Sequence, residues 1–218
     1  MQADNWWIWF LDLMPGLLVS AELTGMLLLI GLPLGMLLAI GLASRNRAVR
    51  FAVTAVVELS RGIPALVLLY LVYFGLPQIH MELDAFLSAS IALGVSFAAY
   101  SCAAIRAGLD AVPNGQREAA RALGLHAGDE LFRVILPQAV RMVTPPLLGW
   151  AIIYFQATSL AFAIAVPELL SRAYTLAVQN FQYFTLLGLA AVIYAAVSIP
   201  ASLFADYLAN RRHARART

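Results

Sequence analysis

The feature that most constrains the fold is a series of long apolar runs that carry almost no charge. Five runs occupy most of the chain, at about residues 17–43, 51–76, 85–109, 134–155 and 184–208. A helix needs about 20 mostly apolar residues to cross a bilayer. Only 12% of the residues are charged, about half the usual share in soluble proteins. The sequence therefore predicts an all-α integral membrane protein with five transmembrane helices.

The distribution of arginine predicts how these helices are oriented. With five crossings, the loop at 45–50, the polar stretch at 110–133 and the C-terminal tail all fall on one side. These segments hold ten arginines, whereas only Arg172 falls clearly on the other side. Because loops rich in arginine remain in the cytoplasm, we expect an external N-terminus and a cytoplasmic C-terminus.

The two ends of the chain differ from the apolar runs. Residues 1–16 include Trp6 and Trp7, and tryptophan favours the membrane interface, so we expect an external interfacial segment there. Residues 17–208 are expected to form the transmembrane domain. Residues 209–218 form a basic cytoplasmic tail, which we expect to meet anionic lipid headgroups of the bilayer and not nucleic acid.

The composition argues against several classes of enzyme. All 14 basic residues are arginine, so a phosphate-binding loop that ends in Gly-Lys-Ser or Gly-Lys-Thr is excluded, and any ATP must be bound by another chain. The three histidines are far apart and show no metal-binding spacing. A hydrolase inside the membrane would need a nucleophile and a base there, and no histidine lies in an apolar run.

The polar stretch between the third and fourth runs contains a predicted short helix, at about residues 115–126. Good helix formers follow a turn at Pro113, and Gly124 is a plausible stop. The helix is too polar to cross the membrane. Ala119 and Ala120 leave a flat surface on which another protein could pack, although an ordinary solvated helix would have the same pattern.

Several motifs in this chain resemble those of ATP-binding cassette (ABC) importer permeases. Glu118-Ala119-Ala120, then Gly124, then Val134-Ile135-Leu136-Pro137 resembles their EAA loop, with Val134 where the family most often has Ile. Further blocks follow the family order: Arg61-Gly62-Ile63-Pro64, Ala99-Tyr100 and Thr158-Ser159-Leu160. Over roughly residues 17–208 the chain is similar to the polar amino acid branch in particular.

This resemblance implies a type I ABC importer permease fold in a bacterial inner (cytoplasmic) membrane. Two permease subunits, identical or homologous, would pair, and an external solute-binding protein would deliver an amino acid. The short helix would dock on a separate ATP-binding subunit, which would hold the ATP and Mg²⁺, so no cofactor is expected on this chain. The residues implied in this coupling are Glu118, Ala119, Ala120, Gly124 and Leu125.

A second set of residues is implied in the substrate pathway: Arg61, Gly62, Pro64, Tyr100, Gln156, Thr158 and Ser159. A charge within a span is costly and is usually functional or paired, and Gly-Pro breaks expose backbone groups. The alternatives are that Arg61 reaches the interface beside Glu58 and that the hydroxyl and amide groups only bond neighbouring helices.

Two departures from the family pattern bear on the solute. Ala103 stands where the branch commonly has Glu, and Gln156-Ala157 replaces a Lys-Asp or Lys-Asn pair. Two carboxylate positions are thus neutral, so we expect that this subunit binds no cationic side chain, or that it is the non-binding half of a heterodimer. A permease for another solute, such as methionine or an opine, and a motor-independent channel remain alternatives.

Overall fold

A computed structural model describes residues 6–215, without the side chains of Ala127 and residues 210–215. The outermost parts of the predicted interfacial segment and basic tail therefore lie outside the described residues. Between residues 6 and 215 the chain is helical and contains no strand. The long helices are α1 (Trp6–Leu42), α4 (Ala85–Asp110), α7 (Leu136–Ala157) and α9 (Tyr183–Arg215). The shorter ones are α2 (Arg47–Gly62), α3 (Ala65–Tyr70), α5 (Asn114–Ala122), α6 (Ala127–Asp129) and α8 (Leu169–Asn180).

Tighter or wider helical turns extend two of these helices, α3 and α7. A π-helical stretch, Leu71–Gly75, and a 3₁₀ turn, Leu76–Ile79, continue α3. The π-helical stretch Glu130–Ile135 precedes α7, and the 3₁₀ helix Thr158–Ile164 follows it.

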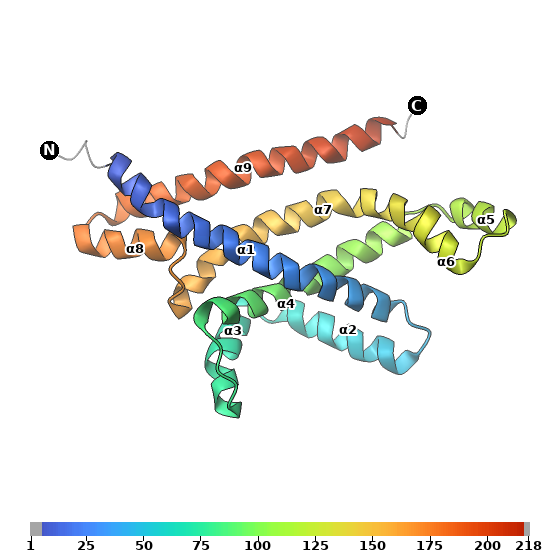
Figure 1. Ribbon diagram of the computed structural model, residues 1–218, viewed down its shortest axis with the longest axis horizontal. Helices are drawn as coiled ribbons and strands as arrows, with labels where there is room; N and C mark the ends of the chain where they lie inside the picture. The colour runs from blue at the N-terminus through green and yellow to red at the C-terminus, as the bar shows by residue number, and fades with distance from the viewer. Residues whose placement is uncertain (1–5, 216–218) are drawn as a thin grey trace.

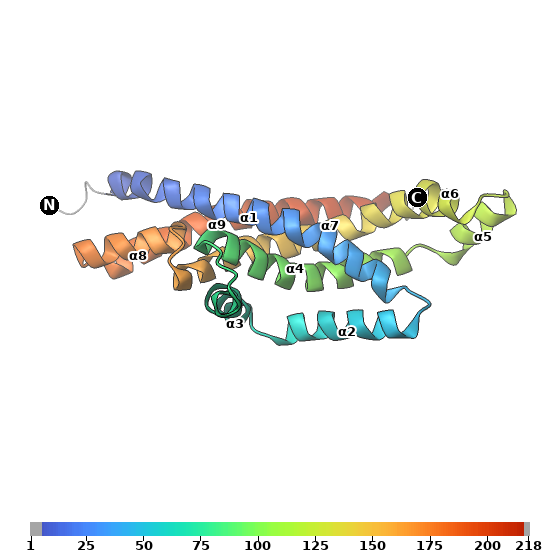
Figure 2. The same cartoon turned by 60° about the horizontal axis from the view of Figure 1, so that its bottom comes forward.

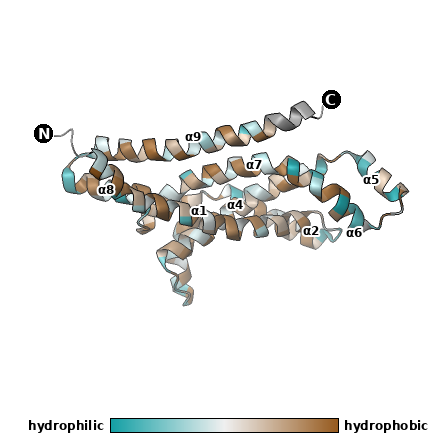
Figure 3. Cartoon of the chain, turned by 45° about the horizontal axis from the view of Figure 1, so that its top comes forward, coloured by the Kyte–Doolittle hydropathy of each residue, from teal (hydrophilic) through white to brown (hydrophobic). Residues whose placement is uncertain are grey.

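The long helices run side by side in an elongated bundle (Figures 1 and 2). The α1–α2 connection and α5 lie at the end of the bundle where α9 finishes, whereas α8 lies at the end where α1 begins (Figure 1). The three arginine-bearing segments are therefore grouped at one end, as the predicted topology requires. Hydrophobic residues cover much of the long helices, and hydrophilic residues are prominent around α5, α6 and α8 (Figure 3).

Four segments are long and apolar enough to cross a membrane: Trp6–Leu42, Ala85–Asp110, Glu130–Ile164 and Tyr183–Ala209. The fifth predicted span is a bent pair, Arg47–Gly62 and Ala65–Ile79, whose axes differ by 104°. The break follows from Pro64, which has no N–H to donate and disfavours helix at the residue before it. Ile63 is accordingly extended, with φ −86° and ψ 126°.

The first span begins earlier than the apolar run suggests. Helix α1 starts at Trp6 and continues through Pro15 and Pro33. Its 37 residues make it about 55 Å long, which exceeds the roughly 30 Å of a bilayer core. Residues 6–16 are therefore the first turns of this helix and not a separate segment, but they can still project to the interface.

The most extensive helix contact of the bundle joins α1 to α4. Gly31 and Gly35, four residues apart, face α4, as in the small-residue contacts that let membrane helices approach closely. A Cβ atom on Gly31 would lie 2.6 Å from Cδ1 of Phe97 and 2.7 Å from the carbonyl oxygen of Gly94. A Cβ atom on Gly35 would likewise collide with the side chain of Ser101 and the carbonyl oxygen of Ala98.

This contact predicts a sharp difference between two glycines of one helix. Gly31→Leu should destabilise the protein by about 1–3 kcal/mol or more, because the backbone of α4 cannot yield. Gly25→Leu is the control, because a Cβ atom at Gly25 would meet nothing within 4 Å. Thermal unfolding of both variants in the same detergent tests this, and equal melting temperatures would contradict the proposed close contact.

Candidate functional site

Helix α5 is a short, well-terminated helix between two spans. It starts after Pro113 and ends at Ala122, somewhat before the predicted limit of residue 126. The N–H of Gly124 donates to the carbonyl of Arg121 (2.9 Å), and the N–H of Leu125 donates to that of Ala120 (3.1 Å). This is a Schellman termination, and it requires the left-handed φ of +75° that Gly124 adopts. Gly124 therefore has a structural role as the stop of α5.

A buried carboxylate fastens α5 to the start of the fourth span. Glu130 is only 5% exposed and receives hydrogen bonds from Nε and Nη2 of Arg121, at 2.9 and 3.4 Å. Arg117 adds an ion pair at 3.9 Å. The hydrogen bond to Glu130 raises the pKa of the Arg121 guanidinium above its ordinary value. The sequence analysis did not identify Glu130. Arg117 and Arg121, which are one helical turn apart and precede Asp129-Glu130, could have indicated an ion pair there.

The outward face of α5 differs from the predicted one. Glu118 and Ala119 are exposed, but Ala120 is 3% exposed and faces inward. The flat surface therefore includes Ala119 and not Ala120, because successive helical positions point about 100° apart. Leu123, just past the helix, is 82% exposed and adds an apolar side chain to this surface, while Leu125 is half-buried.

The break between α2 and α3 places a charge against aromatic rings. The guanidinium carbon of Arg61 lies 5.5 Å from the ring centroid of Tyr100, within the range of a cation–π contact. Tyr100 in turn packs on Trp150 of α7, with ring centroids 4.4 Å apart. Arg61 also pairs with Glu58 at 3.6 Å, as the alternative interpretation anticipated. Gly62 and Pro64, at the break itself, are exposed.

The polar residues at the end of α7 have different surroundings. Thr158 is fully buried and donates to the carbonyl of Phe155 at 2.7 Å. Ser159 donates to the carbonyl of Gln156 at 2.8 Å, and the Gln156 side chain is exposed. Of these three residues, Gln156 is exposed and Ser159 is half-buried, whereas the hydroxyl of Thr158 is bound to the last turn of α7.

A second buried carboxylate ties together α1, α8 and α9. Glu168 is fully buried; its carboxylate accepts from the N–H groups of Leu170 (2.9 Å) and Ser171 (2.7 Å) and from the hydroxyl of Tyr194 (2.7 Å). The hydroxyl of Ser20 accepts from the N–H of Leu169 at 3.2 Å. Burial raises the pKa of Glu168, and these hydrogen bonds act in the opposite direction. Nothing in the sequence pattern indicated that Glu168 is buried.

Comparison with known proteins decides the family. Residues 31–217 match the model of the family described as "Binding-protein-dependent transport system inner membrane component". The chain belongs to this family. It is therefore a multi-pass membrane permease subunit of an ABC importer, with the type I permease fold that its motifs implied.

Two curated relatives and one solved structure match most of the length of this permease. The probable amino-acid ABC transporter permease protein YckA of Bacillus subtilis is 34% identical over 83% of this chain and 80% of its own. The L-cystine transport system permease protein TcyB of Bacillus subtilis is 34% identical over 90% of this chain and 84% of its own. A crystal structure of an amino acid ABC transporter with histidines superposes with a TM-score of 0.88, at 29% identity, over 97% of this chain and 100% of that one.

The ion pair between Arg121 and Glu130, which clamps α5 to the start of the fourth span, can be tested by removing Arg121. Arg121→Ala leaves Glu130 with only the longer ion pair to Arg117. We expect amide hydrogen exchange in α5 to accelerate several-fold, since exchange follows the free energy of local opening. Arg133→Ala is the control, because its pair with Asp129 (2.8 Å) is more exposed. Equal exchange in both variants would contradict a clamp at Glu130.

Proposed function

We propose that this permease carries an amino acid into the cell and that α5 is its contact with a separate ATP-binding subunit. The observation that carries the coupling role is the exposed face of α5, held by the buried Glu130 to the start of the fourth span. A solvated helix in a loop does not need a buried ion pair that joins it to a span. A helix that is displaced by an ATP-binding subunit must transmit this displacement to a span without bending.

The chain connections of α5 support this transmission. It joins α4, through Asp110, to the π-helical stretch that leads into α7. The apolar contacts of Val112 with Ile135 and Ala139 add to the ionic clamp. A displacement of α5 would therefore reach two spans together. ATP binding can shift the permease between inward- and outward-facing states only if the motor contacts these two states differently.

The solute assignment rests on the relatives and on the membrane site. Two named relatives are amino-acid permeases, and the exposed Gln156 and the half-buried Ser159 offer an amide and a hydroxyl to a polar solute. Arg61 adds positive charge beside Tyr100. We further propose that this permease pairs with a second permease subunit and receives its solute from an external solute-binding protein. Its N-terminus is external and its C-terminus is cytoplasmic in this proposal. A methionine or opine permease is the alternative.

The coupling role predicts that Glu118→Arg weakens binding of the ATP-binding subunit. The reversed charge would face the partner surface, and disruption of an interface hot spot weakens binding about tenfold or more. Affinity purification in nanodiscs, with mass spectrometry and an ATPase assay, measures both association and coupled activity. Glu82→Arg, an equal reversal at an exposed site away from α5, should behave as wild type. If no ATPase copurifies with the wild-type complex, the importer assignment is in doubt; if Glu118→Arg retains it, α5 is not the contact.

The neutral membrane site predicts the charge preference of uptake. In vesicles, unlabelled neutral amino acids should compete with transport, whereas arginine and lysine should compete poorly. Ala157→Asp should increase inhibition by arginine, because it restores a carboxylate that attracts the cationic side chain, and Ala157→Asn is the uncharged control. Strong arginine inhibition of the wild type, lost in Gln156→Ala, would contradict this preference.

A further inference from the structure

Two exposed surfaces run along helix α2, beside the face that packs on α1 and α4. The first consists of five exposed polar residues, which we call the polar stripe: Arg47, Arg50, Thr54, Glu58 and Arg61. Because a helix turns by about 100° per residue, these five positions fall within an arc of about 80°. The second surface is apolar and lies on nearly the opposite side of the helix, where Val56 and Leu59 are 48% and 63% exposed. Helix α2 therefore requires two different environments.

The polar stripe extends from one end of the bundle to about half the depth of a bilayer. Arg47 follows the α1–α2 connection, at the end of the bundle where α5 lies (Figure 1), and α2 then runs along the outside of the bundle (Figure 2). Arg61 lies against the ring of Tyr100, which precedes the end of α4 at Asp110 by ten residues. Ten helical residues correspond to about 15 Å, half of a bilayer core of about 30 Å. The stripe therefore reaches the level of the bilayer midplane.

Hydrocarbon cannot cover the inner part of this stripe. A charged side chain at membrane depth almost always faces the protein interior or a water-filled cavity. Arg47 and Arg50 are close enough to the start of α2 to extend toward the headgroups, but Glu58 lies about 16 Å from Arg47 along the helix axis. The Glu58 side chain is 65% exposed, and its partner Arg61, at 3.6 Å, is 41% exposed. This ion pair therefore needs water or another polar surface beside it.

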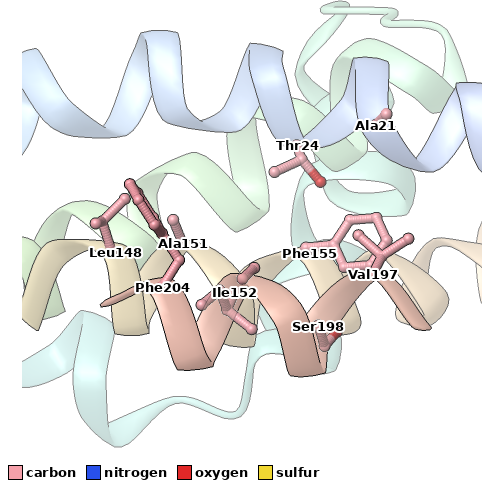
Figure 4. Close-up of a pocket in the computed structure, with 10 residues that line it drawn as sticks. Ala21, Thr24, Leu148, Ala151, Ile152, Phe155, Val197, Ser198 and Phe204 are labelled. Carbon is pink, nitrogen blue, oxygen red and sulfur yellow. The ribbon is translucent and has the colours of Figure 1, made fainter. Parts of the chain in front are cut away.

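The side of the bundle that α9 covers differs from the polar stripe. A groove between α9, α1 and α7 is shown in Figure 4, and none of the described residues that line it is charged. Its polar members are the hydroxyl residues Thr24 and Ser198, and its other lining residues, such as Ile152 and Phe204, are apolar. Such a surface can face hydrocarbon, whereas the polar stripe cannot.

We propose that the polar stripe forms one wall of a water-filled route by which the solute leaves the permease toward the cytoplasm. This inference rests on the proposed importer function and on the topology that places α5 in the cytoplasm. The route begins at the break between α2 and α3, where Arg61 contacts Tyr100, and ends at Arg47 beside the α1–α2 connection. The apolar surface with Val56 and Leu59 faces away from this water.

The charge of the stripe matches an amino acid without a cationic side chain. Three arginines and one glutamate leave the stripe with a net positive charge. A surface of one sign raises the local concentration of ligands of the opposite sign. The stripe therefore favours the carboxylate of the departing amino acid and disfavours a cationic group, which agrees with the neutral positions Ala103 and Ala157.

Labelling of single cysteines tests the proposal, because the permease has one native cysteine, Cys102, which is fully buried. Thr54→Cys and Glu58→Cys are each made in the intact importer complex in inside-out vesicles, and a membrane-impermeant methanethiosulfonate is added on the cytoplasmic face. Both should react in the absence of ATP, whereas wild type should give only background labelling. Val56→Cys and Leu59→Cys, the matched controls on the apolar surface, should not react.

The charge of the reagent and the presence of nucleotide make the test more specific. An anionic methanethiosulfonate should react with Thr54→Cys several-fold faster than a cationic one, after each rate is divided by its rate with a free thiol in solution. Adding Arg50→Gln should reduce this preference, because it removes a positive charge one helical turn away. A non-hydrolysable ATP analogue should slow the labelling of Glu58→Cys, because the outward-facing state closes the route to the cytoplasm.

Four results would overturn the proposal. No reaction at either Thr54→Cys or Glu58→Cys would show that lipid or protein covers the stripe. Equal reaction at all four positions would place α2 in the aqueous phase outside the membrane. No preference for the anionic reagent would remove the role of the arginines. Labelling that the ATP analogue leaves unchanged, in a complex that retains its ATP-binding subunit, would separate the stripe from the solute route.

Failure of the proposed function would be recognised separately. If the wild-type complex contains no ATP-binding subunit, the importer assignment itself is contradicted. The labelling without nucleotide does not depend on that subunit, so it still decides whether the polar stripe contacts water.

Discussion

Inside a bilayer the hydrophobic effect does not hold helices together, so the fold depends on how closely α1 and α4 can approach. Lipid tails are as apolar as the side chains that they would replace, and helices associate through packing and hydrogen bonds. Gly31 and Gly35 supply the packing by letting the α4 backbone come within contact distance. The other spans then assemble around this pair: α7 packs on α4 through the Phe97–Tyr154 and Tyr100–Trp150 rings, and α8 and α9 close over the end of α1.

The sequence was sufficient to predict the elements whose cause is local. Apolar runs predicted the spans, Pro64 the break in the second one, and Gly124 the end of α5, because each depends on nearby residues alone. Burial of particular polar groups was not predictable in this way. Ala120 and Thr158 were expected at functional surfaces and lie inside, and Glu130 was missed, because burial depends on which face of a helix meets a partner from elsewhere in the chain. The coupling and substrate roles themselves stay predictions.

The two candidate functional regions are built in opposite ways. Helix α5 has a firm termination and a buried ionic clamp, which suits a part that transmits force. The junction of α2 and α3 has an extended residue, an exposed glycine and a proline, and its Arg61 is held by a ring face and a solvent-exposed ion pair. The exposed ion pair of Arg61 contributes only about 0–1 kcal/mol, so it restrains this junction less than the buried Glu130 restrains α5.

The hydrogen bonds around Glu168 limit how the first and last spans can move relative to each other. Glu168 and its neighbour Leu169 lie outside the spans, yet their hydrogen bonds attach α8 to Ser20 of α1 and Tyr194 of α9. Breaking any one of these bonds would strand a polar group away from water, so the three helix segments form a single rigid body at that end of the bundle. The first and last spans, which are farthest apart in the chain, must then turn together, and the degrees of freedom left for alternating access belong to the spans between them.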